Sequence, residues 1–223
     1  MRLGMSEEEL FGYTEIYRGM LITAIDESAK LGFKRPAIIS PEANIEDSVL
    51  RTTSELLGEL SGFLDRVVPG YWGNSCQTLS SNIFAHLNNQ GIAANIVLGN
   101  VWVGATDEFE TTLESLQEEV RANEPLQGEQ KVHAWISLGG DTIVDAALPP
   151  RLVRHYQAPE QFEDMMFIGR AAEMVARYNI KYQPILVGTE FFARTNPPDP
   201  MDLLNKMMER KRLIGRDFLG FNT

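Results

Sequence analysis

The sequence contains few of the features that mark secreted, membrane-spanning or nucleic-acid-binding proteins. It has one cysteine among 223 residues, so no disulfide can form within the chain. The N-terminal stretch MRLGMSEEELFGYTEIYRGM lacks the apolar core of a signal peptide, and no apolar run is long enough to span a membrane. Twenty Lys and Arg against 31 Asp and Glu give a net charge of -11, which repels a nucleic-acid backbone. We therefore expect a cytoplasmic protein that binds neither nucleic acid nor a membrane.

The residues that are present are typical of a globular protein. Hydrophobic residues make up 43% of the chain and charged residues 23%, which is ordinary usage for a packed domain. The length allows a single domain with one sizeable core. We predict one domain over 1–223, with a helical lobe at 1–69, a core at 70–192 and a C-terminal helix at 193–223. The oligomeric state is left open.

Helical periodicity dominates the first part of the chain. Apolar residues recur at helical intervals over 6–31 and 45–69, and again over 76–90, where Gly91 closes the helix. A further helix is predicted over 159–179.

Strand signals follow the third helix. The run IAANIVLGNVWVG predicts two strands separated by a turn at Gly99-Asn100. The stretches KVHAWISL and TIVDAAL flank GGD and predict a β-hairpin, and KYQPILVGTEFF predicts another short strand. The predicted fold class is α+β with a small antiparallel sheet.

The segment 107–130 differs from the rest of the predicted core in its charge. It contains eight acidic residues and one basic residue, with a thin apolar stripe formed by Phe109, Leu113, Leu116 and Val120. We predict a mostly exposed helix inserted between strands. A role in steering a cationic substrate is the alternative to a simple solvated face.

The single cysteine lies where a thiolate is favoured. Cysteine attacks as the thiolate, and its pKa falls at a helix N-terminus. Asn74 or Ser75 can cap the helix, which leaves Cys76 in the first turn, where free N–H groups favour an anion. The amides of Cys76 or Gln77 are candidates for stabilising an oxyanion. The alternative is that Cys76 is a buried apolar side chain.

Three histidines are candidates for a base near this cysteine. His86 lies ten residues further along the same predicted helix, a rise of about 15 Å, so it cannot reach Cys76. His155 follows PPRLVR in a predicted loop. His133 lies on a predicted strand in VHAW, which makes it the candidate base.

A carboxylate is predicted to lie beside His133. The hairpin returns the chain so that Asp145 falls opposite residues 133–135, close enough to accept a hydrogen bond from the imidazole. Asp141 is the other candidate, but it belongs to the turn GGD. Cys76, His133 and Asp145 can therefore act as nucleophile, base and orienting group.

These motifs resemble a known family. GNSCQTLSSNIFAHLNNQGIAANIVLG and HAWISLGGDTIVDAA resemble the transglutaminase-like branch of the papain-like cysteine hydrolases. The resemblance implies a papain-like core in which the nucleophile-bearing helix packs on a small antiparallel sheet, and it places the triad on Cys76, His133 and Asp145. The chain departs from the family in its acidic insertion and in the ending DAALPP, where the family commonly has a DPT-like sequence.

The resemblance implies a cysteine protease, hydrolase or acyl transferase that acts on an amide, peptide or thioester bond. Two alternatives are an inactive relative that binds a peptide and an N-acetyltransferase-type enzyme. Gln77, Trp72 and Tyr71 are candidates to form the oxyanion site or the cleft. We expect no cofactor, and no metal either, because no Cys or acidic residue stands at ligand spacing around His86 or His155. The expected partner is a peptide or a small acyl substrate.

Overall fold

The computed structural model describes residues 7–33, 39–67, 76–122, 130–195 and 199–219.

Helices make up most of the described chain. They are α1 (Glu7–Lys30), α2 (Asp47–Val67), α3 (Cys76–Asn89), α4 (Leu113–Ala122), α5 (Leu148–Tyr156), α6 (Ala171–Tyr178), α7 (Glu190–Thr195) and α8 (Pro200–Leu219), with a 3-10 turn η2 (Glu160–Phe162). The three helices predicted before residue 91 are confirmed as α1, α2 and α3, with ends that differ by one or two residues from the prediction.

The strands form one antiparallel sheet in the described part of the chain. They are β1 (Asn95–Val103), β2 (Thr106–Asp107), β3 (His133–Ser137), β4 (Thr142–Asp145), β5 (Phe167–Arg170) and β6 (Ile180–Val187). The strand order is β2-β1-β3-β4-β5, and β6 pairs with β1 on its other side. The predicted α+β class with an antiparallel sheet is therefore confirmed.

The predicted turn at Gly99-Asn100 is wrong, because β1 continues through both residues as one strand. Gly99 pairs with His133 of β3 and with Pro184 of β6, next to a register shift in the β6 pairing. A Cβ atom on Gly99 would lie 2.0 Å from the carbonyl oxygen of Gln183. The glycine therefore permits the close approach of β6 at a bulge and does not mark a turn.

The helix predicted over 159–179 is also wrong in its first half. That segment forms η2, then β5, and only then α6. β5 pairs along its whole length with β4, from Thr142 opposite Arg170 to Asp145 opposite Phe167. Pairing at the edge of the sheet thus overrides the helical spacing of the apolar residues.

The loop predicted around His155 is a helix. His155 lies in the last turn of α5, which begins with Pro149 and Pro150 in its first turn. Proline is well tolerated there because the first amides of a helix have no intrahelical acceptor.

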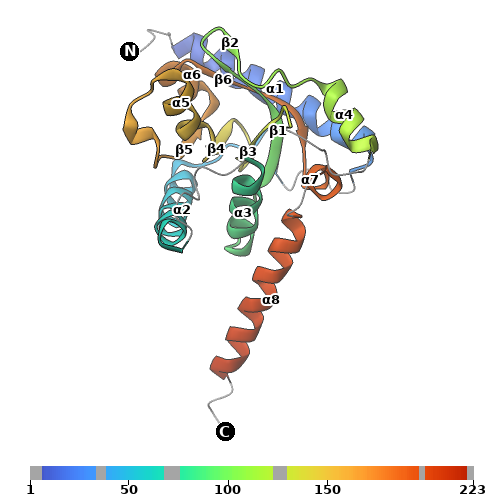
Figure 1. The fold of residues 1–223 in the computed structure, drawn as a ribbon, viewed down its shortest axis with the longest axis vertical. Coiled ribbons are helices and arrows are strands. Elements are labelled where there is room, and N and C mark those ends of the chain that lie inside the picture. The colour runs from blue at the N-terminus through green and yellow to red at the C-terminus, as the bar shows by residue number, and fades with distance from the viewer. Residues whose placement is uncertain (1–6, 34–38, 68–75, 123–129, 196–198, 220–223) are drawn as a thin grey trace.

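Two apolar layers enclose the sheet. One layer lies between the sheet and α3, and it includes Phe84, Leu87 and Ile96. The other lies between the sheet and α1, and it includes Tyr17 and Trp135. Figure 1 shows α1 and α6 on one side of the sheet and α2 and α3 on the other. β3 is thus held between α3 on one face and α1 on the other.

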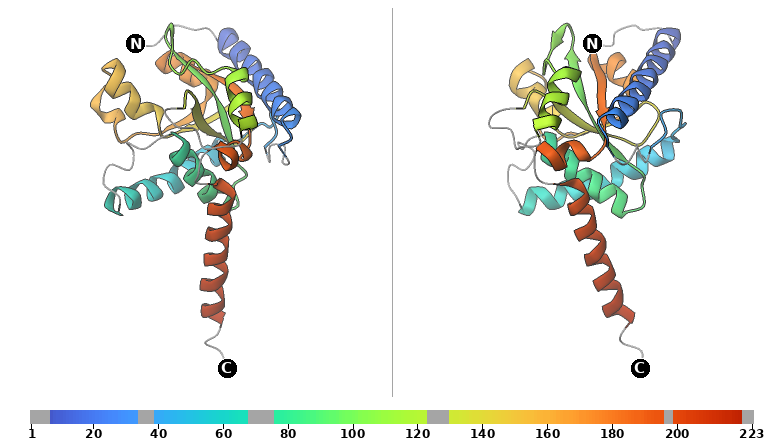
Figure 2. Two further views of the ribbon diagram at one scale, coloured as in Figure 1. Left: turned by 45° about the vertical axis from the view of Figure 1, so that its right-hand side comes forward. Right: turned by 90° about the vertical axis from the view of Figure 1, so that its right-hand side faces the viewer.

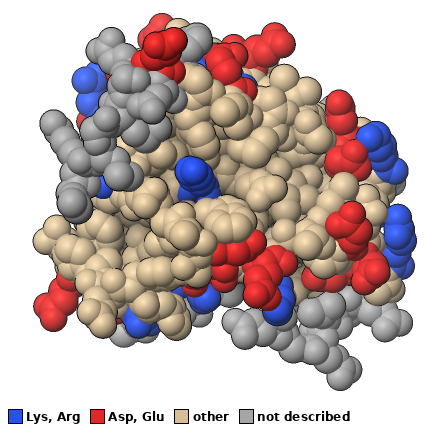
Figure 3. Space-filling view, turned by 90° about the horizontal axis from the view of Figure 1, so that it is seen from above, with Lys and Arg blue, Asp and Glu red and all other residues tan. Residues whose placement is uncertain are grey.

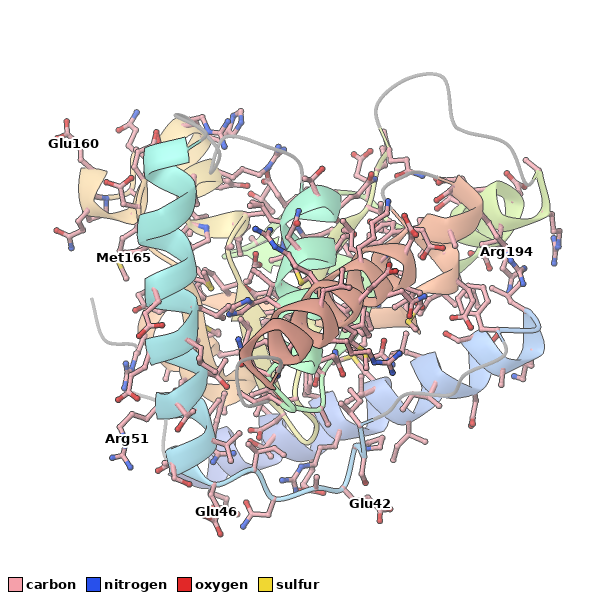
Figure 4. The ribbon with its side chains drawn as sticks, turned by 90° about the horizontal axis from the view of Figure 1, so that it is seen from below. Glu42, Glu46, Arg51, Glu160, Met165 and Arg194 are labelled. Atoms are coloured by element: carbon pink, nitrogen blue, oxygen red, sulfur yellow. The ribbon has the colours of Figure 1, made fainter. Side chains whose placement is uncertain are left out.

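Helix α7 connects the end of the sheet to α1. Arg194 of α7 donates hydrogen bonds to the carbonyl oxygens of Leu31 at 3.4 Å and Gly32 at 3.5 Å, and its guanidinium lies over Phe33 (Figure 4). These carbonyls follow the last turn of α1, where a cation is favourable.

Among the residues of α8 whose side chains are described (200–213), those of the first turns pack against the body, and Lys211 donates a hydrogen bond to the carbonyl oxygen of Asn89 at 3.0 Å. Leu203, Leu204 and Met207 pack against the core beside α3, whereas Leu213 is 56% exposed. Figure 2 shows the rest of the helix projecting away from the body, with the C-terminus at its far end.

Figure 3 shows acidic side chains at several places around the margin of the face seen from above. Among the described helices, none is long and apolar enough to cross a membrane.

Candidate active site

Cys76 is the first residue of α3 and lies against the start of β3. Its side chain is half-buried, and its thiol donates a hydrogen bond to the carbonyl oxygen of Val132 at 3.5 Å. One turn further along α3, the hydroxyl of Ser80 donates to the carbonyl oxygen of Ala134 at 2.9 Å. These two bonds dock the N-terminal turn of α3 along the backbone on either side of His133.

His133 is the first residue of β3 and is 1% exposed. Its Nε2 atom lies 2.6 Å from Oδ2 of Asp145 on β4. The register of the hairpin, with Ile136 opposite Val144, produces this contact. The predicted pairing of His133 with Asp145 is therefore confirmed as geometry.

Asp145 is fully surrounded by hydrogen-bond donors. Its Oδ2 atom accepts from His133 and from the hydroxyl of Tyr182 at 2.9 Å. Its Oδ1 atom accepts from the backbone amides of Ala147 at 2.9 Å and Leu148 at 3.1 Å, where α5 begins. A buried carboxylate with four donors at a helix N-terminus is stabilised in its charged form.

The two side chains shift each other's protonation. Burial by itself lowers the pKa of His133, but the charge and hydrogen bond of Asp145, together with the nearby Cys76 thiol, raise that pKa to about 10. Burial raises the pKa of Asp145, yet His133 and the amides of Ala147 and Leu148 lower it below the ordinary value. The pair is therefore an imidazolium and a carboxylate at neutral pH.

The second imidazole nitrogen is the one available for chemistry. Because Nε2 of His133 is bonded to Asp145, only Nδ1 can exchange a proton with another group. Nδ1 is buried and has no hydrogen-bond partner among the described residues. The Cys76 thiol is close enough to influence the pKa of His133, but its hydrogen bond goes to Val132. A rotation of the Cys76 side chain could redirect the hydrogen bond of its thiol from Val132 to Nδ1 of His133.

Aromatic rings surround the imidazole of His133. Phe109 stacks on it, with ring centroids 4.8 Å apart and an interplanar angle of 16°. Trp135 lies at 6.0 Å and 24°, and Tyr182 at 6.4 Å in a tilted arrangement. The indole N–H of Trp135 donates to the hydroxyl of Tyr17 on α1 at 3.1 Å. The imidazole is thus fixed by ring contacts as well as by its hydrogen bond.

The predicted cleft residues fall into two groups. Gln77 follows Cys76 in α3, and its side chain donates a hydrogen bond to Gln130, which in turn donates to Glu119 of α4 at 2.6 Å. Its role in an oxyanion site stays a prediction.

Tyr71 and Trp72 lie outside the described residues. The same is true of the predicted capping residues Asn74 and Ser75.

The other carboxylate and histidines lie in different surroundings. Asp141 accepts hydrogen bonds from Thr14 at 2.9 Å and Arg170 at 3.3 Å, so it ties the hairpin turn to α1 and β5. His86 is half-buried, and burial lowers its pKa. His155 is exposed on α5. No group of three or more His, Cys, Asp or Glu side chains in the described chain could hold a metal ion.

Two residues of the site, Phe109 and Tyr182, were not predicted from the sequence. Phe109 was expected in the apolar stripe of an exposed helix, but α4 begins only at Leu113 and Phe109 precedes it. Tyr182 lies on the predicted β-like run, whose alternating buried and exposed residues mark one face. The alternation identifies the buried face of β6, but nothing in the local sequence indicates that Tyr182 on this face contacts Asp145.

We also compared the chain with known proteins. No family model, no curated protein and no solved structure matches it. The class of site is therefore argued from its geometry: a helix-borne thiol beside a buried imidazole–carboxylate pair.

Proposed function

We propose that this protein is a cysteine hydrolase or acyl transferase with a transglutaminase-like, papain-like core, acting on an amide, peptide or thioester bond. Cys76 is the nucleophile, His133 the base and Asp145 the orienting carboxylate. The observation that supports this most is the buried bond between His133 and Asp145, which leaves Nδ1 without a partner among the described residues beside a thiol at a helix N-terminus. His86 also has a buried nitrogen without a partner in the described structure, but only that of His133 belongs to a ring bonded to a carboxylate and lying near a thiol.

The first half of the reaction forms an acyl-enzyme. Because His133 is an imidazolium at neutral pH, the reactive form is a pair in which the thiol proton already lies on Nδ1 of His133. The Cys76 thiolate of this pair attacks the carbonyl carbon of the substrate. The backbone N–H groups at the start of α3 stabilise the oxyanion. The tetrahedral intermediate then collapses, the bond to the leaving group breaks, and the imidazolium gives its proton to the departing amine or thiolate. Asp145 keeps Nε2–H in place throughout.

The second half releases the acyl group. Neutral His133 takes a proton from water or from an acceptor amine as that molecule attacks the thioester on Cys76. The carbon–sulfur bond breaks, the proton stays on Nδ1 of His133, and the thiolate–imidazolium pair is restored. Water gives hydrolysis and an amine gives acyl transfer, so the same site serves both.

Thiol reactivity tests the pairing of Cys76 with His133. We expect iodoacetamide to alkylate Cys76 with an apparent pKa well below about 8.5, the value of a free cysteine, because the neighbouring imidazolium stabilises the thiolate. His133→Ala should return that apparent pKa toward the ordinary value. His155→Ala, which alters an exposed histidine, is the matched control and should leave the profile unchanged. A wild-type thiol that titrates normally and ignores the loss of His133 would contradict the proposal.

A second measurement separates the two kinds of acyl donor. Mass spectrometry after mixing with an acyl-CoA should show an acyl group on wild-type Cys76 if the protein is an N-acetyltransferase-type enzyme, and none if it is a peptidase. Cys76→Ala is the blank, because it removes the only thiol in the chain.

A further inference from the structure

The segment that carries Phe109 is fixed at both ends. The backbone amide of Glu108 donates to the carbonyl oxygen of Val101 on β1 at 3.0 Å. On the other side, the hydroxyl of Thr111 donates to the carbonyl oxygen of Lys131 at 2.9 Å, two residues before His133. Phe109 lies between these two anchor points. Its ring is therefore placed over the imidazole by bonds that do not involve the imidazole.

The side chain of Glu108 adds a third anchor. The Glu108 side chain is 7% exposed, and its carboxylate accepts hydrogen bonds from Arg151 and from the hydroxyl of Tyr156, both on α5. Burial and the carboxylate of Glu108 raise the pKa of Tyr156 to about 12, so the phenol remains a donor. The guanidinium of Arg151 also lies 4.9 Å from the ring centroid of Phe109. Phe109 thus contacts both a guanidinium and the imidazole.

Helix α5 links this anchor to the carboxylate of the pair. Its first amide, that of Leu148, donates to Asp145, and its later turns supply the two donors to Glu108. One short helix therefore fixes Asp145 at the edge of the imidazole and Phe109 over its face. Two independent constraints on one ring hold its plane more firmly than a single hydrogen bond does.

We propose that Phe109 is a positioning residue for the His133 imidazole, and that Glu108 holds it in place through Arg151 and Tyr156. This inference rests on the proposed role of His133 as a base and adds what orients that base. Phe109 shields one face of the ring from water, and its π-face favours the imidazolium form of His133. The segment 106–112 then serves the site rather than forming part of an exposed helix.

Several titratable or charged groups surround His133, and any pH readout must account for them. In the described chain they are Cys76 of α3, Asp145 of β4, Tyr182 of β6, and Arg151 of α5 with Glu108 behind Phe109; Tyr17 of α1 reaches the site through Trp135.

The first test uses the Nε2–H proton of His133 in the full chain. A hydrogen bond of 2.6 Å to a buried carboxylate should give a low-field proton NMR signal that is protected from exchange with water. Phe109→Ala should broaden or abolish this signal, because water reaches the ring, while Phe109→Tyr should preserve it. An unchanged, protected signal in Phe109→Ala would overturn the proposal. This readout does not depend on whether the protein catalyses any reaction.

The second test compares two carboxylates in the same segment. Glu108→Gln removes the charge that holds Arg151, whereas Glu110→Gln removes a charge whose pairing with Lys131 is solvent-exposed. We expect Glu108→Gln to lower the rate of Cys76 alkylation at pH 6 about tenfold and to weaken the NMR signal, because a misplaced base loses much of its effect. Glu110→Gln should match the wild type. Equal effects of the two variants would show that the segment acts through its charge alone and would overturn the proposal.

The two hypotheses can fail separately. If Cys76 shows an ordinary thiol pKa while the Phe109 and Glu108 variants still change the NMR signal, the proposed function fails and the positioning of His133 stands. If Cys76 is activated but neither variant alters the signal, the positioning of His133 by Phe109 and Glu108 fails and the proposed function stands.

Discussion

At the scale of single residues, Asp145 shows how a buried charge is made tolerable. An isolated carboxylate would neutralise itself in such a place, but each oxygen of Asp145 accepts two hydrogen bonds. The backbone amides come from its own chain continuation, whereas His133 and Tyr182 come from two other strands. The strand partners therefore decide which way the carboxylate faces.

Replacing Asp145 with Asn should lower the free energy of unfolding by about 3–5 kcal/mol at pH 6, because it leaves one partner of a buried charge pair without the other. The raised pKa of His133 makes the pair's stabilisation fully present below the ordinary value of 6.5 and lost as the pH rises toward 10. The lowered pKa of Asp145 makes the stabilisation of the pair fully present above the ordinary pKa of 3.8, and this stabilisation is lost as the pH falls further.

Urea unfolding of the wild type and Asp145→Asn across this range measures the difference. It should be largest between about pH 4 and 6.5, since both ordinary pKa values lie outside that interval. A difference that stays constant up to pH 10 would argue against a charged pair.

At the scale of secondary-structure elements, the position of Cys76 depends on how α3 docks on β3. Ser80 and Ser81 are adjacent in α3 and both buried, but they differ in bonding. The hydroxyl of Ser80 donates to Ala134, whereas that of Ser81 has no hydrogen-bond partner in the described structure. A hydrogen bond thus holds one side of the helix to the strand.

Ser80→Ala should cost about 1–2 kcal/mol of unfolding free energy, since it removes a buried donor from its acceptor. Ser81→Ala should be neutral or stabilising, because it removes a polar atom that is buried without a bond. Chemical denaturation of the two variants makes the comparison, with circular dichroism to check that helix content is preserved. A larger loss for Ser81→Ala than for Ser80→Ala would contradict this view of the interface.

At the scale of the whole molecule, the body and the projecting part of α8 contribute differently to stability. Leu204 is 8% exposed and packs into the core beneath the sheet, while Leu213 on the same helix is 56% exposed. The first turns of α8 therefore close the core, and the later turns lie beyond it (Figure 2).

Leu204→Ala should reduce the unfolding free energy by about 2–3 kcal/mol through lost burial and a cavity. Leu213→Ala should change it by no more than about 0.5 kcal/mol, as is usual for an exposed position. Thermal unfolding of both variants at equal concentration provides the measurement. If Leu213→Ala proved the more damaging, the projecting turns would have to be packed in solution.

Features that depend on residues close together in the chain could be predicted from the sequence. Periodicity located α1, α2 and α3, and the short hairpin brought Asp145 to His133, which is twelve positions away along the chain. Such contacts follow from strand geometry and loop length, so they can be counted from the residues.

Features that depend on residues far apart in the chain could not be predicted in this way, because they arise from packing in the folded protein. β1 continues through Gly99 because β6 needs that close approach, and 167–170 forms a strand because β4 offers it a paired edge. Phe109 and Tyr182 contact the imidazole of His133 from two other segments of the chain. The residue patterns of those segments indicate which side is apolar, but not what that side contacts. The neighbours of a side chain across a sheet depend on how the whole molecule packs, so they cannot be predicted from a local sequence pattern.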